Sequence, residues 1–255
     1  AVVADNAVAE GVCATDPSAL TAHLIYHDTI EPPCLAKPHP RLSPLYAPRE
    51  RCYGHALNDP ACARNRYFAR NLEAVLDWFD HREWLLFEYY SDYILFRGML
   101  PVIPEVIAQD LRYYRSLGLN TAQHLFVGSG VGLQLNMHVH AALCWDLNSD
   151  PWEALRNLSR DVPGLIGAWR KQARASLRWL DISDWPISRY FDYRFLLEMP
   201  AKIAAPYRRG LLKAAQEMET AAASLPSELP AWAEGERWSL LSSAAICRQM
   251  EPQAR

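Results

Sequence analysis

The stretch WLLFEYYSDYILF, residues 84 to 96, decides the fold class that the sequence predicts. Its first half is an apolar and aromatic run of strand length, with one carboxylate, Glu88, in the middle. Side chains alternate across a strand, so Glu88 shares a face with Leu86 and Tyr90. A glutamate buried in a strand is costly unless it is paired or used. Glu88 is therefore the first candidate for a functional residue.

Strands and helices alternate on both sides of this stretch. Strands are expected at 22–28, 45–47, 84–90 and 119–128, and helices at 4–13, 60–80, 104–117 and 133–145. This alternation predicts a parallel sheet with helical crossovers. Helical patterns then cover 150–177 and 194–223, with interruptions expected at Pro200 and Pro206, and no definite element is predicted beyond 224. We therefore expect an α/β part, residues 1–145, and a helical extension, residues 146–255.

Three residues mark expected helix ends. Asp59 followed by Pro60 has the pattern of an N-cap and first helical position. Gly118 stands where a helix would end on a left-handed residue.

Composition and charge exclude some classes of function. The chain has 255 residues, is 50% apolar, and carries 26 Lys and Arg against 29 Asp and Glu, a net charge of −3. That balance offers no strongly basic surface, so nucleic acid is not an expected partner. No apolar run reaches membrane-spanning length, so no membrane span is expected. The chain begins at Ala1 without a signal-peptide pattern, which favours the interior of a longer chain or a processed product, and the compartment is not assigned.

The cysteines and histidines do not form a metal-binding pattern. Six cysteines occur without a CxxC pair or regular spacing, which favours free thiols over a zinc site: Cys13, Cys34, Cys52, Cys62, Cys144 and Cys247. His138 and His140, two apart in an expected helix, face different sides. Ser129 lacks the GxSxG spacing, and no GxGxxG or phosphate-binding loop is present. We therefore expect neither a metal nor a cofactor.

Polar side chains gather where the predicted strands end. They are Tyr26, His27 and Asp28 after the first strand, Arg49, Glu50, Arg51 and His55 after the second, and Glu88, Tyr89, Tyr90 and Asp92 in the third. Parallel strands end at one edge of a sheet, where α/β proteins place their chemistry. Strand ends also carry polar groups simply because they meet water, but three successive ends with carboxylates beside aromatic rings favour a shared site.

Paired carboxylates among aromatic rings suit glycoside hydrolysis, in which one acid protonates the leaving oxygen and another carboxylate attacks or stabilises. The candidate catalytic carboxylates are Glu88, Glu50 and Asp28. Glu88 is the first choice for the acid and Glu50 the second. If an arginine contacts Glu88, we expect Glu88 to become a binding or stabilising carboxylate and Glu50 to be the better acid. The tyrosines, histidines, arginines and Asp92 at these strand ends are the expected substrate-binding residues.

Several short motifs, in order, resemble a known family. They are YHDTIEPP (26–33), LYAPRERCYGHAL (45–57), FEYYSD (87–92) with ILFRG (94–98), DLRYYRSLGLN (110–120) and CWDLNSDPWEAL (144–155). Over roughly residues 5–175 the chain is similar to the bacterial domain of unknown function 4838, counted as glycoside hydrolase family 163. The resemblance implies a (β/α)8 TIM-barrel-like fold and an endo-β-N-acetylglucosaminidase acting on N-glycans by a retaining, acetamido-assisted mechanism. It also implies an extracytoplasmic or periplasmic location.

The chain departs from that family in length. A barrel needs eight strand–helix units and about four are predicted here, so the chain looks like the carboxyl-terminal half of a barrel followed by a helical extension. The expected partners are a glycan substrate and the missing half of the barrel or a partner chain. The competing interpretation is a non-catalytic carbohydrate-binding or assembly module with the same aromatic cleft.

Overall fold

The computed structural model describes residues 1–79, 83–96, 98–127, 134–180 and 201–251. A four-stranded parallel sheet in the order β1-β2-β3-β4 forms its centre. The strands are β1 (Thr21–Ile25), β2 (Leu42–Tyr46), β3 (Leu85–Asp92) and β4 (Ala122–Val127). This sequential parallel order is compatible with part of a (β/α) barrel, and the four described strands do not close one. The predicted α/β class is confirmed.

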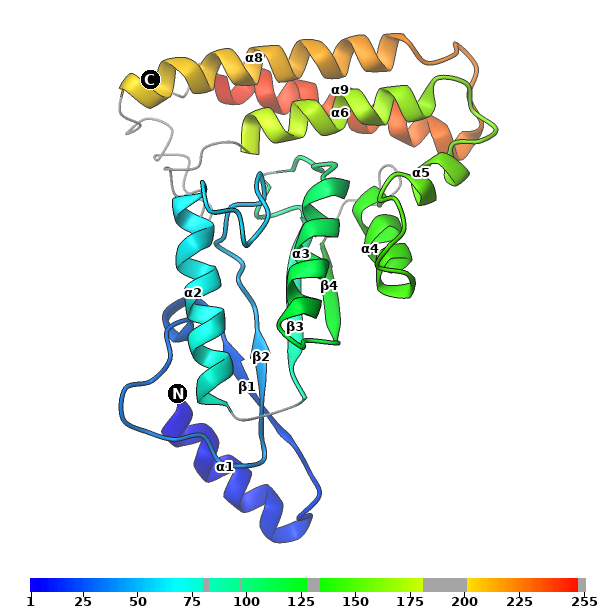
Figure 1. Ribbon diagram of the computed structural model, residues 1–255. Helices are drawn as coiled ribbons and strands as arrows, with labels where there is room; N and C mark the ends of the chain where they lie inside the picture. The colour runs from blue at the N-terminus through cyan, green and yellow to red at the C-terminus, as the bar shows by residue number, and fades with distance from the viewer. Residues whose placement is uncertain (80–82, 97, 128–133, 181–200, 252–255) are drawn as a thin grey trace.

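Helices connect and follow the strands, as Figure 1 shows. α2 (Ala63–Trp78) joins β2 to β3, α3 (Pro104–Ser116) joins β3 to β4, and α4 (Leu135–Trp145) follows β4. The connection from β1 to β2 is different, because it holds only the 3-10 turn η1 (His27–Thr29) and a proline-rich loop. At the N-terminus, α1 (Val2–Thr15) contacts β1, and Asp5 Oδ2 lies 2.6 Å from His23 Nδ1.

The described residues after α4 form mostly helices. These are α5 (Glu153–Leu158), α6 (Leu165–Leu180), α8 (Ala201–Ala223) and α9 (Ala231–Met250). In Figure 1, α6, α8 and α9 run side by side across one end of the α/β part. The Val102 N–H donates to Ser176 Oγ at 3.0 Å, and the Phe96 and Trp179 rings pack edge-on with centroids 5.9 Å apart. One hydrophobic core therefore continues from the sheet into the helical layer.

Several predicted boundaries are wrong. β2 begins at Leu42 and not at residue 45, and the helix predicted over 150–177 is two helices, α5 and α6. β1 ends at Ile25, so Tyr26 to Asp28 lie beyond the strand. α2 begins at Ala63 with Cys62 as its N-cap, because the Leu57 N–H donates to Asp110 at 2.6 Å and the following residues form turns. α8 continues through Pro206, and α9 was not predicted at all. In both helices, packing among α6, α8 and α9 overrides weak local signals.

Two other predictions, on Ser129 and on Pro200, concern residues outside the described part of the chain. Among the described helices, none is long and apolar enough to cross a membrane.

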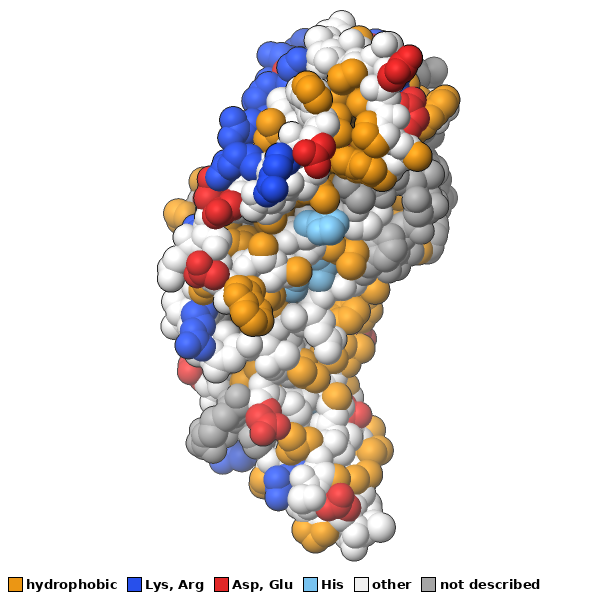
Figure 2. All heavy atoms as spheres, turned by 90° about the vertical axis from the view of Figure 1, so that its right-hand side faces the viewer, with side chains coloured by type: hydrophobic (Ala, Val, Ile, Leu, Met, Phe, Trp, Pro, Cys, Tyr) orange, Lys and Arg blue, Asp and Glu red, His pale blue; other side chains and the backbone are white. Residues whose placement is uncertain are grey.

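The outer strands of the described sheet are β1 and β4. Figure 2 looks onto the right-hand side of Figure 1 and shows hydrophobic side chains along much of its height, interspersed with acidic and basic ones. Trp145, at the end of α4, is 94% exposed and Met137 is 39% exposed.

Gly118 allows a test of the end of α3. Its φ of +84° is left-handed and its surroundings are open, so an added methyl group meets strain but no clash. We expect Gly118→Ala to lower the free energy of unfolding by about 1–2 kcal/mol in urea denaturation. Gly11, inside α1 with nothing within 4 Å of an added Cβ, is the matched control. There the same substitution should raise stability by roughly 0.5–1 kcal/mol, and equal signs at both positions would contradict this account.

Candidate functional site

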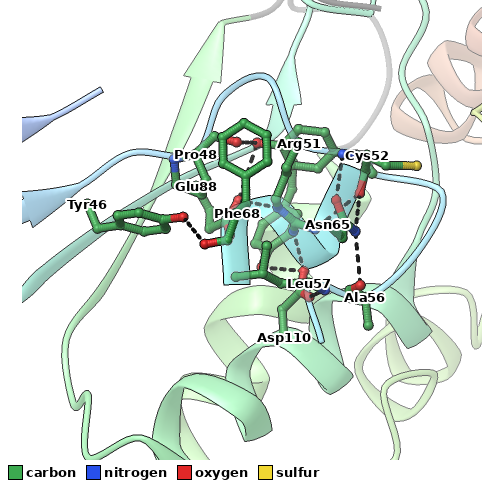
Figure 3. A network of polar contacts seen from close by, with 12 residues as sticks. Tyr46, Pro48, Arg51, Cys52, Ala56, Leu57, Asn65, Phe68, Glu88 and Asp110 are labelled. Carbon is green, nitrogen blue, oxygen red and sulfur yellow. Dashed lines mark hydrogen bonds and ion pairs between the residues drawn. The ribbon is translucent and has the colours of Figure 1, made fainter. Parts of the chain in front are cut away.

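Glu88 lies in a fully buried polar cluster and has no exposed surface. Its Oε2 accepts from Arg51 Nε at 3.3 Å and from the Tyr53 hydroxyl at 3.3 Å. Its Oε1 accepts a hydrogen bond from the Tyr114 hydroxyl. Figure 3 shows Glu88 and Arg51 within this group of polar contacts. A buried carboxylate with this many donors is satisfied where it stands.

Asp110, on α3, completes this buried cluster. Its carboxylate accepts from Arg51 Nη2, from the Leu57 N–H at 2.6 Å and from the Tyr90 hydroxyl at 3.0 Å. Burial raises the pKa of Asp110 to about 6, against the opposing attraction of Arg51. Arg51 also lies over the Tyr53 ring, 4.3 Å from its centroid. We call Arg51, Glu88, Asp110 and the three tyrosines Tyr53, Tyr90 and Tyr114 the buried cluster.

A second group of polar side chains lies where β1, β2 and β3 end. His27 Nδ1 is 2.8 Å from Glu50 Oε1. Arg49 reaches Asp92 Oδ2 with both Nε and Nη2, each at 2.7 Å. The parallel strands bring these residues to one edge of the sheet, as the sequence predicted. Together with Tyr26 and Tyr89, these four residues form the rim cluster.

Aromatic rings flank the rim cluster. The Tyr26 and Tyr89 rings are nearly parallel, 18° apart, with centroids 6.3 Å apart. The Arg49 guanidinium lies 5.6 Å from the centre of the Tyr89 ring. These contacts join the exit of β1 to the end of β3.

The turn that carries His27 has an unusual backbone. His27 has a φ of +51°, and it is the only described non-glycine residue with a positive φ. Thr29 fixes the turn, because its hydroxyl accepts from the Tyr26 N–H at 2.8 Å and donates to a backbone carbonyl. Left-handed backbone at a residue with a side chain costs free energy, and such strained residues cluster at functional sites, although histidine adopts this conformation more often than most residues.

Glu50 differs from the buried Glu88 in its access to solvent. Its side chain is 13% exposed, so it borders solvent without being surrounded by it. Burial raises the pKa of Glu50, and the neighbouring charge of His27 opposes the rise. A carboxyl group whose pKa is raised holds its proton to a higher pH than an ordinary carboxyl group does, which is the change that a general acid needs.

The residues predicted for one site divide into three places. Tyr26, His27, Arg49, Glu50, Tyr89 and Asp92 form the rim cluster, and Asp28 is exposed next to His27. Arg51, Glu88 and Tyr90 belong to the buried cluster. His55 lies elsewhere, with its Nδ1 3.3 Å from Cys52 Sγ. Arg51 thus contacts Glu88 in the structure. From the sequence we expected that an arginine contact to Glu88 would make Glu50, and not Glu88, the better acid.

The sequence analysis missed Asp110, Tyr53 and Tyr114. A signal for Asp110 was present, because it falls between Ile107 and Leu111 on the apolar side of its helix. An acid on that side must be paired on burial. The two tyrosines gave no such signal, because an apolar position accepts a tyrosine without any polar role.

One further group of side chains has metal-binding chemistry. The ligand atoms of Cys52, His55 and Cys62 all lie within 4.8 Å of one another. All six cysteines are free thiols in the structure.

Comparison of the chain with protein-family models, with curated proteins and with solved structures found no match.

Proposed function

We propose that the chain belongs to a glycoside hydrolase in which Glu50 is the general acid and base. One observation carries the proposal: Glu50, with a pKa raised by burial, lies at an accessible sheet edge 2.8 Å from His27 and in the same cluster as the Tyr26–Tyr89 pair. Aromatic faces bind sugar rings, and a protonated carboxyl is what a glycosidic oxygen needs to leave. The family resemblance supports N-acetylglucosamine-containing glycans as the substrate class.

The reaction we propose proceeds in two steps and retains configuration. First, Glu50 donates its proton to the leaving oxygen while the substrate's own acetamido oxygen bonds to the anomeric carbon. Then the Glu50 carboxylate removes a proton from water, and that water opens the cyclic intermediate. We assign the orientation of the acetamido group to Asp28, which is exposed beside His27. Glu88 acts indirectly, because it and Arg51 fix the strand and loop that carry Tyr89 and Glu50.

A second candidate function is a non-catalytic carbohydrate-binding or assembly module. It is favoured by the state of the other carboxylates, because Asp92 is held by Arg49 and Glu88 is buried. Among the other predicted carboxylates, Glu50 contacts His27 and is 13% exposed, and Asp28 is exposed.

A pair of substrates distinguishes the two functions. We expect hydrolysis of an aryl β-N-acetylglucosaminide and no hydrolysis of the matching aryl β-glucoside, because the glucoside lacks the acetamido nucleophile. Binding of N-acetylglucosamine oligomers is measured in parallel by calorimetry. Binding without hydrolysis would support the module, and neither binding nor hydrolysis would contradict both functions.

A further inference from the structure

Two cysteines and a histidine meet where the loop after β2 reaches α2. Cys52 and His55 lie in that loop, and Cys62 is the N-cap residue of α2. Cys52 Sγ is 3.3 Å from His55 Nδ1, and all three ligand atoms lie within 4.8 Å of one another. Both cysteines are buried, whereas His55 is partly exposed. We call these three residues the thiol–histidine cluster.

The backbone that carries the cluster is held in place by Asn65. Its Oδ1 accepts from the Cys52 N–H at 2.7 Å, and its Nδ2 donates to the carbonyl oxygens of Cys52, His55 and Ala56 at 2.9 to 3.0 Å. Figure 3 shows Asn65 between Cys52 and Ala56, with the Cys52 sulfur directed away from it. The convergence of the side chains thus rests on a buried and fully bonded loop.

We propose that Cys52, His55 and Cys62 form a binding site for a thiophilic transition-metal ion, with zinc as the best fit. Two sulfurs and one imidazole nitrogen are soft ligands that suit zinc and exclude calcium and magnesium. Zinc bonds of about 2.3 Å to sulfur and 2.0–2.1 Å to nitrogen place tetrahedral ligand atoms roughly 3.5–4 Å apart. The observed separations are at most 4.8 Å, so the ligand atoms need to close by at most about 1.3 Å, which side-chain rotation supplies.

The chemistry of binding balances without any further reactant. Each thiol releases its proton to solvent and forms a metal–sulfur bond, while neutral His55 donates a nitrogen lone pair. Two thiolates neutralise a divalent ion. The fourth position is left to water or an exchangeable ligand at the partly exposed His55 side, as in zinc sites with three protein ligands.

A bound ion would tie the loop to the start of α2. The same loop begins at Glu50 and Arg51, so the ion would stabilise the segment that links the rim cluster to the buried cluster. The lack of a CxxC pair and of regular cysteine spacing had led us to expect no metal site. The fold brings these ligands together, and the inference is independent of the proposed function.

Metal uptake tests the inference. The chain is reduced, stripped with a chelator, given zinc chloride and desalted, and its zinc is then measured by mass spectrometry. We expect about one zinc ion per chain and a rise in Tm of several degrees when free zinc exceeds its Kd about a hundredfold. Cobalt in place of zinc should give thiolate charge-transfer absorption, which reports sulfur ligation without any substitution.

Four single variants locate the site. Cys52→Ser and Cys62→Ser should each weaken zinc binding at least about tenfold in competition with a chromophoric chelator. Cys34→Ser and Cys144→Ser, which change exposed thiols, are the matched controls and should keep the wild-type affinity. Zinc below a tenth of an equivalent, or cobalt bound without the thiolate band, would overturn the proposal.

Discussion

Replacement of Arg51 by methionine should lower the free energy of unfolding by roughly 3–5 kcal/mol at neutral pH. Arg51 is fully buried and is the cation that both Glu88 and Asp110 contact. Without it, two carboxylates remain in an apolar interior with no opposing charge. Urea denaturation followed by circular dichroism measures the loss.

The loss should depend on pH in a defined direction. In the wild type, burial raises the pKa of Asp110 to about 6, above its unfolded value, so its stabilising contribution is present at low pH and is lost as the pH rises through about 6. Removal of Arg51 removes the attraction that holds this pKa down. The variant should therefore lose more stability than the wild type as the pH rises from about 5.5 to 8.

Two control variants test whether the loss of stability in Arg51→Met depends on the burial and on the charge of the residues involved. Arg248→Met breaks an exposed two-pronged contact with Glu219 and should leave the free energy of unfolding nearly unchanged, because solvent screens an exposed ion pair. The triple change of Arg51 to methionine, Glu88 to glutamine and Asp110 to asparagine removes every charge together and should recover much of the loss. An Arg51→Met loss no larger than that of Arg248→Met would show that the buried cluster does not form.

Glu50→Gln should reduce glycoside hydrolysis by about 10²- to 10⁴-fold, because the amide cannot donate a proton to the leaving oxygen. An aryl glycoside with a good leaving group needs less protonation, so its loss should be smaller than that of a natural glycan. The measurement is kcat/KM for both substrates in wild type and variant. Equal losses on the two substrates would remove Glu50 from the acid role.

The pH profile gives a second readout for Glu50. A general acid must be protonated, so wild-type activity should fall as the pH rises through the pKa of Glu50, and this fall should be absent in Glu50→Gln. His27 opposes the burial-driven rise of that pKa. His27→Ala should therefore shift the fall to higher pH. Glu88→Gln, a change in the buried cluster, should leave the position of the fall unshifted.

Local sequence determined the elements that depend on local physics. The apolar run around Glu88 forms β3, and the left-handed residue Gly118 ends the helix predicted before it. Strand–helix alternation gave the parallel sheet, because crossovers of that length permit little else. The same alternation of strands and helices predicted that polar residues lie together at one edge of the sheet, and the rim cluster lies at that edge.

Tertiary structure decided which polar residues are open to a ligand. Glu88 and Glu50 are both carboxylates near strand ends, yet one is sealed by Arg51 and tyrosines while the other borders solvent beside His27. That difference comes from α3, whose Asp110 and Tyr114 lie more than twenty residues from Glu88 in the chain.

Helix α9 and the continuation of α8 through Pro206 were likewise decided by packing between helices. The thiol–histidine cluster has the same origin, because the nine residues between Cys52 and Cys62 bring the two cysteine side chains together only when Asn65 and Asp110 fold the loop. Sequence patterns specify periodicity and polarity, whereas burial and pairing depend on contacts between segments distant in the chain.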